Sequence, residues 1–238
     1  MTFRHLLSAS ILTATVAALS ATAAAEDLDG GFFILNEDWY GHQNSTINYL
    51  RPDDPDGVYW DYRVFQSRNP GKELGCTAQH GIAWGGRLYL IAKQEKDPGA
   101  SIVGARITVC DAKTMECLAQ LTEIAPSGKR CDGRGACGVS LEKVYISSSN
   151  GIWIFDTRSL TITGQIPGTE NPNGTGGATT DPSGALYKGQ CGTMVPADGL
   201  VFAAHQQSGL LIIDPNTDRV IKTISMDVVQ DGAGIGSI

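Results

Sequence analysis

The chain has 238 residues, a formal net charge of -7, 29 glycines and 10 prolines. Its charges are scattered and no basic stripe is present, which argues against nucleic acid as a partner because phosphate backbones are bound by clustered Lys and Arg. The glycines and prolines indicate many tight turns, and no long segment repeats its apolar residues at a helical period. An all-β domain is therefore expected.

Residues 1–25 are typical of a signal peptide. Arg4 and His5 precede an apolar stretch over residues 6–19, which is followed by three alanines and then Glu26. This pattern predicts cleavage near Glu26 and a protein that is periplasmic, displayed on the cell surface or secreted. The apolar stretch is shorter than the about 20 residues of a membrane-spanning helix, and no later segment is apolar enough to cross a bilayer. Residues 26–238 are expected to form one domain.

The next elements form a first group of three strands, and three longer units follow. Strands are expected over 32–36, 45–50 and 58–65, and the later units cover about 77–121, 136–166 and 191–224. Each later unit has an apolar strand that ends on an aspartate and a polar turn, at Asp111, Asp156 and Asp214. Short strands that recur in this way are typical of β-propeller blades.

The number of blades follows from the strand count. The first group lacks an innermost strand, and residues 232–238 resemble the opening of a further inner strand. We therefore expect four blades and the start of a fifth, with the domain incomplete at its C-terminus and the natural protein longer. A closed ring of four blades is the alternative.

Six cysteines in an exported chain favour disulfides. Cys110 and Cys117 flank a predicted hairpin turn and are expected to pair, because cross-strand neighbours lie close enough for a disulfide. A second predicted pair, Cys131 with Cys137, brackets a glycine-containing loop. The pairing of Cys76 and Cys191 stays open.

Three of these cysteines also suggest a second interpretation. Cys76, Cys137 and Cys191 occur in similar glycine-containing frames, so their thiols could surround the axis and bind zinc or copper(I). The cysteine and histidine spacing of known zinc modules is absent, and we predict no metal site.

Candidate ligand-binding residues are predicted on one face of the propeller. Loops between second and third strands, and loops that enter inner strands, should meet there. Flat rings supply stacking and polar tips fix orientation, as a small-molecule or glycan site requires. Ordinary packing of the loops is the alternative. The candidates are Trp39, Tyr40, His42, Gln79, His80, Gln190, His205 and Gln206.

No catalytic residue is predicted. The chain has no Gly-x-Ser-x-Gly elbow and no phosphate-binding glycine loop, so His80 lacks a nucleophile to activate. Asp111, Asp156 and Asp214 are interpreted as turn residues that accept backbone amide hydrogen bonds. We expect a non-catalytic protein without a cofactor. The alternatives are a propeller enzyme of the lactonase or quinoprotein type, and a structural surface-layer component.

Several segments resemble one family of exported proteins. Residues 31–37, 44–47, 148–156, 189–195 and 209–215 are similar to surface-layer-like β-propellers of the YVTN-repeat type, which are common in bacteroidal bacteria and mostly of unknown function. The resemblance implies that the chain is a fragment of a seven-bladed propeller. Some relatives are surface lipoproteins that capture corrinoids, so the resemblance also allows a corrinoid ligand. This chain departs from them, because Ala25, Glu26 and Asp27 stand where a lipidated cysteine would follow the signal.

Together these observations predict an exported, non-catalytic β-propeller. Its loop face is expected to bind a small molecule, a glycan or a surface partner protein.

Overall fold

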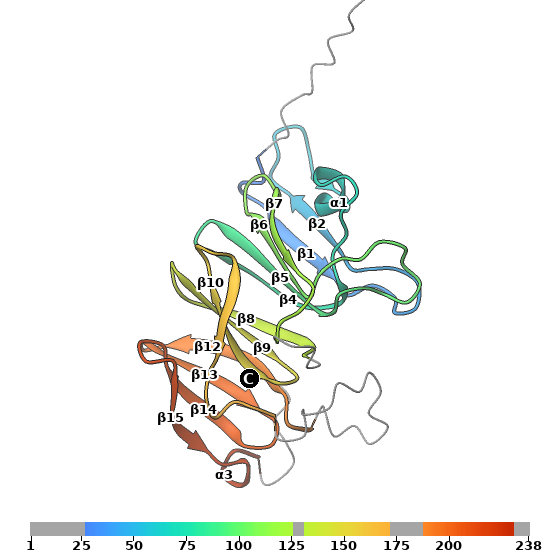
Figure 1. The fold of residues 1–238 in the computed structure, drawn as a ribbon. Coiled ribbons are helices and arrows are strands. Elements are labelled where there is room, and N and C mark those ends of the chain that lie inside the picture. Colours follow the sequence, from blue (N-terminus) through green and yellow to red (C-terminus); the bar gives the residue numbers. More distant parts are fainter. Residues whose placement is uncertain (1–26, 126–130, 172–187, 231–238) are drawn as a thin grey trace, which may run out of the picture.

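A computed structural model describes residues 27–125, 131–171 and 188–230. These residues form one three-stranded and three four-stranded antiparallel sheets, which follow one another in an open arc (Figure 1). Each sheet is called a blade and numbered in chain order. The all-β, blade-like architecture predicted from the repeats is confirmed.

Blade 1 consists of β1 (Phe32–Asn36), β2 (Thr46–Arg51) and β3 (Tyr59–Asp61), and α1 (Val64–Arg68) follows it. The strand predicted over residues 58–65 is wrong in its second half. Arg63 has a left-handed backbone with φ of 54°, and its amide donates to Asn48 Oδ1 at 2.9 Å. This turn ends the strand and directs α1 inward, where Val64 and Phe65 are buried.

Blades 2 to 4 each have four strands in simple sequential order, at the positions expected from the repeats. Blade 2 contains β4 (Cys76–Trp84), β5 (Arg87–Gln94), β6 (Ile107–Asp111) and β7 (Cys117–Leu121). Blade 3 contains β8 (Gly133–Ser140), β9 (Lys143–Ser148), β10 (Gly151–Asp156) and β11 (Thr161–Gln165). Blade 4 contains β12 (Cys191–Ala197), β13 (Leu200–His205), β14 (Gly209–Asp214) and β15 (Arg219–Ile224), and α3 (Met226–Gln230) follows it.

The innermost strands β4, β8 and β12 contact one another in order. In the same arrangement β5 contacts β8, β9 contacts β12 and β1 contacts β4, so β1 occupies the position of a second strand. Within the described residues, blade 1 therefore lacks an innermost strand, as predicted. The predicted opening of a fifth blade, residues 232–238, lies outside the described residues, as does most of the segment that enters blade 4.

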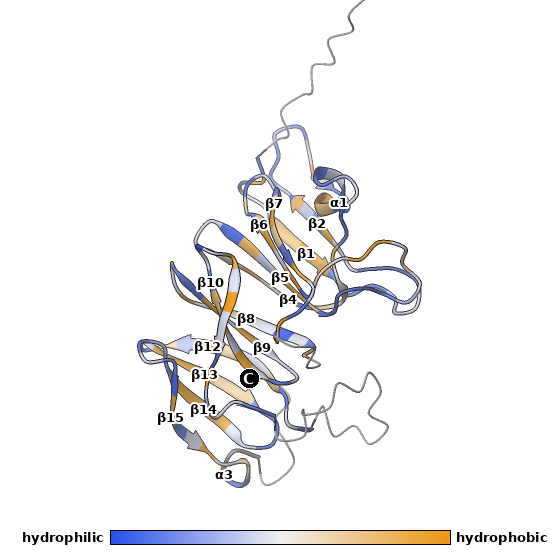
Figure 2. Ribbon diagram, in the orientation of Figure 1, coloured by the Kyte–Doolittle hydropathy of each residue, from blue (hydrophilic) through white to orange (hydrophobic). Residues whose placement is uncertain are grey.

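Three apolar layers hold the blades together, one at each junction. Alternating strand residues point to opposite faces of a sheet, so each middle blade contributes one set of side chains to each neighbour. Figure 2 shows the apolar strands and the polar connections between them. The layers between blades 1 and 2, 2 and 3, and 3 and 4 are centred on Tyr49, Phe155 and Tyr145, respectively.

The recurring aspartates terminate the third strands of blades 2 to 4. Asp111 Oδ1 accepts from the amides of residues 113 and 114, and Asp156 Oδ1 accepts from those of residues 158 and 159. Asp214 Oδ1 accepts from the amide of Asn216. These bonds hold the pKa of each carboxyl below its usual range. The prediction of turn-stabilising aspartates is confirmed.

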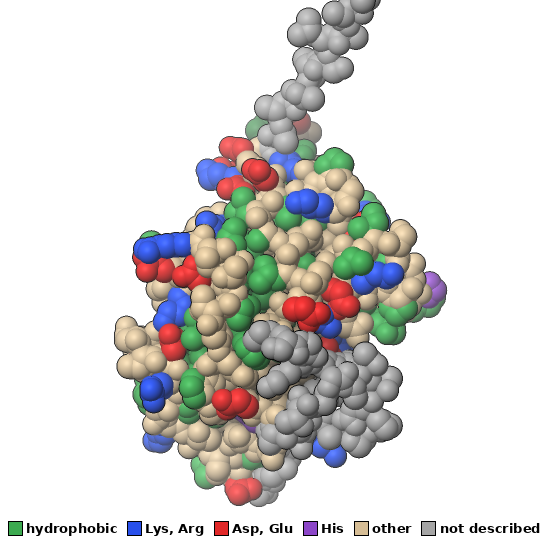
Figure 3. Space-filling view, in the orientation of Figure 1, with side chains coloured by type: hydrophobic (Ala, Val, Ile, Leu, Met, Phe, Trp, Pro, Cys, Tyr) green, Lys and Arg blue, Asp and Glu red, His purple; other side chains and the backbone are tan. Residues whose placement is uncertain are grey.

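On the face shown in Figure 3, acidic and basic side chains are interspersed. None of the helices in the described part of the chain has the length and apolar character needed to span a bilayer.

Candidate functional site

The loop between β1 and β2 carries three of the predicted ligand-binding residues. Trp39 is 73% exposed and Tyr40 is 57% exposed. The ring of Trp39 lies over that of His42, with ring centroids 3.8 Å apart. The loop therefore presents flat apolar surfaces to solvent beside a histidine, as a stacking site for a ligand requires.

Asp97, in the loop between β5 and β6, anchors this aromatic loop. Its residue is fully buried, and Oδ2 accepts from the amide of Gly41 at 2.8 Å and from the Cys76 thiol at 3.3 Å. Oδ1 accepts from the amide of Gly99 at 2.7 Å. Burial raises the pKa of Asp97, but these hydrogen bonds outweigh it and hold the pKa below its usual range. The anchor is a carboxylate at neutral pH.

Asn44 provides the second connection between the two loops. Its side-chain Oδ1 accepts from the amide of Asp97 at 2.7 Å, and its Nδ2 donates to the carbonyl of Ile102 at 2.9 Å. The loops also approach so closely that a Cβ on Gly99 would lie 2.5 Å from the carbonyl oxygen of Gly41. The aromatic loop is thus held in one conformation by buried polar contacts.

A small cleft of about 200 Å³ opens between the two loops and the segment after β3. Its wall is polar. Arg63 lies 3.4 Å from Glu73 in an ion pair, and Gln66 Nε2 donates to the same carboxylate at 2.8 Å. The cleft can therefore offer both donors and acceptors to a ligand that stacks on the nearby rings. The lining residues are His42, Gln43, Asn44, Arg63, Glu73, Gly99, Ala100, Ser101 and Ile102.

A second group of predicted residues lies along the inner strands. His80 Nδ1 accepts from the amide of Ala136 at 3.2 Å, which joins blade 2 to blade 3. Burial lowers the pKa of His80, so at neutral pH the imidazole is neutral and carries its proton on Nε2. Gln79 Nε2 lies 3.5 Å from Glu37 Oε1 and bonds the carbonyl of Thr77.

Gln190, His205 and Gln206 lie together in blade 4. Gln190 Oε1 accepts from Arg134 Nε at 2.6 Å, and the Gln190 carbonyl accepts from the amide of Gln206 at 3.0 Å. His205 is only 1% exposed, and its Nδ1 accepts from the amides of residues 207 and 208. Burial lowers the pKa of His205 and outweighs a hydrogen bond to the backbone of Glu170 that raises it. The structure places His205 inside the fold, where its Nδ1 is hydrogen-bonded to backbone amides.

Comparison with models of known protein families shows which family the chain belongs to. A model described as "Domain of unknown function (DUF5074)" matches residues 30–234. The chain belongs to the DUF5074 family. A search of curated proteins found no match.

Several solved structures are similar to this DUF5074 domain. Raptor from Chaetomium thermophilum is 12% identical with a TM-score of 0.50, and the match covers 84% of this chain and 16% of Raptor. The extracellular domain of the hybrid two-component system BT3049 from B. thetaiotaomicron is 14% identical, with a TM-score of 0.49 and coverage of 87% and 22%. The β-propeller domain of Cps50 (Swd1) from Myceliophteria thermophila is 13% identical, with a TM-score of 0.44 and coverage of 82% and 55%. The chain therefore spans from about a sixth to about half of the length of these structures, and the likeness concerns the fold alone.

All six cysteines of the DUF5074 domain are free thiols in the structure. The predicted Cys131–Cys137 disulfide is wrong, because Cys131 packs between blades 2 and 3 whereas Cys137 packs between blades 3 and 4. Cys131 Sγ instead lies 2.9 Å from Ser148 Oγ. Cys110 and Cys117 are direct cross-strand partners, as predicted, but they are not bonded to each other.

The idea of three equivalent thiols around the axis also fails. Cys76 and Cys191 begin their inner strands, opposite Gln94 and His205, whereas Cys137 lies in mid-strand opposite Tyr145. No cluster of three or more His, Cys, Asp or Glu side chains suited to a metal ion is present among residues 27–125, 131–171 and 188–230.

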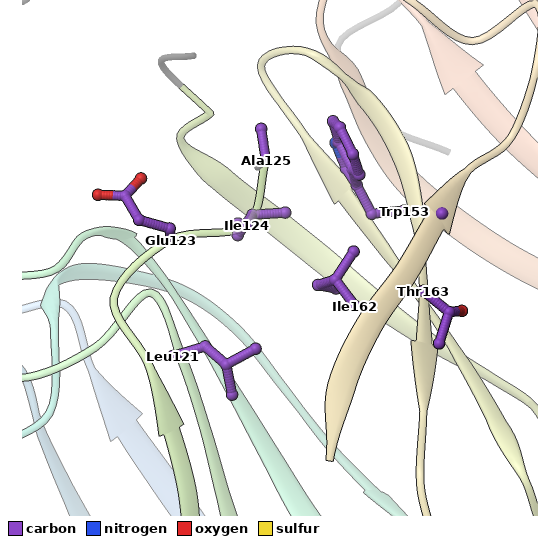
Figure 4. A pocket seen from close by; sticks show the side chains of 8 residues that line it. Leu121, Glu123, Ile124, Ala125, Trp153, Ile162 and Thr163 are labelled. Carbon is purple, nitrogen blue, oxygen red and sulfur yellow. The ribbon is translucent and has the colours of Figure 1, made fainter. Parts of the chain in front are cut away.

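A more apolar cleft of about 260 Å³ lies at the outer seam of blades 2 and 3 (Figure 4). Leu121 and Ile124 from blade 2 and Trp153 and Ile162 from blade 3 point toward it. These side chains belong to the apolar layer between the two blades, and the Trp153 indole already donates to the carbonyl of Asn150 at 3.1 Å. The cleft contains none of the residues predicted from the sequence, and its lining serves blade packing.

The sequence did not indicate Asp97 or Asn44, although these two residues build the site. Asp97 precedes Pro98 and Gly99, which predicts an ordinary turn. Its partners Gly41 and Asn44 lie more than fifty positions earlier in the chain. Only the length of the two loops was a signal, since connections in compact domains are usually short.

Proposed function

We propose that this DUF5074 domain binds a glycan at the paired loops of blades 1 and 2. Trp39 and Tyr40 would stack on the apolar face of a sugar ring, and the adjacent polar cleft would hydrogen-bond its hydroxyl groups. The observation that carries the proposal is the buried Asp97 anchor, which holds an otherwise exposed aromatic loop in place. Preorganisation of this kind lowers the entropic cost of binding.

The size and chemistry of the cleft favour a sugar over a larger cofactor. A volume of about 200 Å³ is below the roughly 300 Å³ at which drug-sized ligands are enclosed. Arg63, Glu73 and Ser101 contribute charged and neutral hydrogen-bonding groups to the lining of the cleft. A ligand with many hydroxyl groups and one flat apolar face matches this combination.

The test is a thermal-shift screen with common glycans and cobalamin, followed by calorimetric titration of each hit, because a ligand of the folded state raises the melting temperature. Replacing Trp39 and Tyr40 together by alanine should weaken glycan binding by roughly 10- to 100-fold. The matched control is Tyr62→Ala, which removes another exposed aromatic ring of blade 1 from outside the cleft. A shift with cobalamin alone, or a glycan affinity that survives the double substitution, would refute the proposal.

We also propose that the domain is exported and acts outside the cytoplasm. The support is the signal-like pattern of residues 1–25 and the resemblance to exported propellers of the YVTN-repeat type. Expression of the whole chain in a bacterial host should give a product that begins near Glu26 in the periplasm or the medium. A cytoplasmic product that retains Met1 would contradict this proposal.

A further inference from the structure

Two apolar residues interrupt the polar wall of the cleft between the paired loops. Ala100 and Ile102 line the cleft, and both belong to the loop between β5 and β6. Ile102 is 40% exposed, and it belongs to none of the three apolar layers that join the blades in the described part of the chain. Packing of the blades therefore does not account for an aliphatic side chain at this position.

Hydrogen bonds fix the backbone that carries these two residues. The amide of Ala100 donates to the carbonyl of Asp97 at 3.1 Å. The carbonyl of Ile102 accepts from Asn44 Nδ2 at 2.9 Å, and Asn44 is itself buried. Because the loop is already ordered, its apolar side chains can contact a ligand at a small cost in backbone entropy.

Groups that can bind an amide line the same cleft. Gln43 Nε2 donates to Asp38 Oδ1 at 2.9 Å, which orients the side-chain amide so that Oε1 is the acceptor it offers to a ligand. Ser101 stands between Ala100 and Ile102, and its exposed hydroxyl group can donate. The cleft therefore combines a hydrogen-bond acceptor, a donor and an aliphatic surface.

An acetamido group on a sugar carries the matching atoms. It has one N–H donor, one carbonyl acceptor and a methyl group, whereas the hydroxyl group of a plain sugar has no methyl group to place on an aliphatic surface. Such a methyl group gains free energy when it leaves water for an apolar contact. A free amino group would instead bring a charged ammonium against Ile102, where the loss of hydration is costly.

We propose that the glycan bound at the paired loops contains an N-acetylated amino sugar, whose methyl group packs on Ala100 and Ile102. This inference rests on the proposed glycan function and narrows the class of its ligand. The sugar ring stacks on Trp39 or Tyr40 while the acetamido group enters the cleft. His42 connects the two parts, because it lines the cleft and its ring centroid lies 3.8 Å from that of Trp39.

Matched sugars test the acetyl group alone. Calorimetric titration of the whole chain compares the trimer of N-acetylglucosamine with the trimers of glucose and of glucosamine in the same linkage, and N-acetylgalactosamine with galactose. The N-acetylated member of a set should bind at least about 10-fold more tightly than its plain and deacetylated counterparts, because one small apolar group in an apolar pocket changes affinity by that factor or more.

A substitution at Ile102 tests the apolar contact. Ile102→Ser removes the aliphatic surface but keeps the backbone carbonyl that Asn44 binds. It should reduce the preference for the N-acetylated sugar to about twofold or less and leave the affinity for the plain sugar unchanged. Val103→Ser is the matched control, because Val103 is the next residue, is 55% exposed and lies outside the cleft lining. Circular dichroism checks that each variant is folded.

Saturation-transfer NMR on the wild-type protein gives a second measurement that needs no variant. The acetyl methyl protons should receive more saturation from the protein than the other protons of the bound sugar, because they contact the aliphatic surface.

The results separate this inference from the glycan proposal. A plain sugar that binds as tightly as its N-acetylated counterpart, a preference that Ile102→Ser leaves intact, or acetyl methyl protons that receive less saturation than the ring protons would overturn the inference and leave the glycan proposal standing. If neither these sugars nor any glycan of the thermal-shift screen binds, both proposals fail.

Discussion

The loops that join second to third strands differ sharply between the two halves of the molecule. In blades 3 and 4 these connections are residues 149–150 and 206–208, whereas in blades 1 and 2 they are residues 37–45 and 95–106. The two long loops are held in place, because hydrogen bonds of Asp97 and Asn44 join one loop to the other. Buried polar residues are costly unless they are fully hydrogen-bonded, so such an anchor indicates a loop whose conformation matters.

The ends of the third strands show the same contrast. Blades 2 to 4 close with an aspartate that accepts amides of the next turn, but β2 ends at Arg51, whose guanidinium binds Asp54. Regular repeats therefore maintain the fold in blades 2 to 4. Departures from the repeat lie in blade 1, which also carries the exposed aromatic residues of the candidate site, and in the long β5–β6 loop of blade 2.

The largest expected effect compares two tryptophans from the two regions. Trp153→Ala removes a ring packed between blades 2 and 3 and should cost about 3–5 kcal/mol of unfolding free energy. Trp39→Ala removes an exposed ring and should change stability by about 0.5 kcal/mol or less. Urea denaturation measures both. An equal cost at the two positions would show that the aromatic loop is part of the folding core.

The second-largest effect is expected from the removal of the loop anchor, Asp97. Asp97→Ala leaves the amides of Gly41 and Gly99 without their acceptor and should cost about 3 kcal/mol. Because the folded pKa of Asp97 is depressed, its contribution is present above the ordinary carboxyl pKa of about 3.9 and is lost as the pH falls through the lower folded pKa. The difference in stability between wild type and variant should therefore shrink from pH 7 to pH 3.

Denaturation at both pH values gives this difference directly. Asp53→Ala is the matched control, because that carboxylate lies on the exposed turn after β2. A difference that stays constant with pH would mean that Asp97 does not act as a buried carboxylate.

The smallest effect concerns the two predicted disulfides. A mild disulfide oxidant should accept two electrons from the Cys110 and Cys117 thiols and join their sulfur atoms across the β6–β7 hairpin, which should stabilise the protein by about 2 kcal/mol. Cys131 and Cys137 should remain reduced, because they lie on opposite faces of blade 3 and pack in different apolar layers. Peptide mapping identifies the bonded pair, with Cys117→Ser as control. Recovery of a Cys131–Cys137 peptide would contradict the packing described here.

The sequence by itself determined the repeat architecture. Apolar strands and turn aspartates such as Asp156 depend on neighbours only a few positions away, so their pattern is visible along the chain. It also indicated the exposed loop residues Trp39 and Tyr40, because a long polar connection places side chains outside the core. The glycan-binding role of these residues stays a proposal.

Only the tertiary structure decided the positions that depend on distant partners. Asp97 anchors the aromatic loop because Gly41, Asn44 and Cys76, which lie in other elements, form hydrogen bonds with it. Cys131 and Cys137 lie on opposite faces of one sheet and therefore cannot pair. Helix α1 stands where part of a strand was predicted, because Asn48 Oδ1 accepts a hydrogen bond from the amide of Arg63 and the strand ends there. Local patterns cannot reveal such contacts, since a hydrogen bond between residues far apart in sequence leaves no periodic trace in either segment.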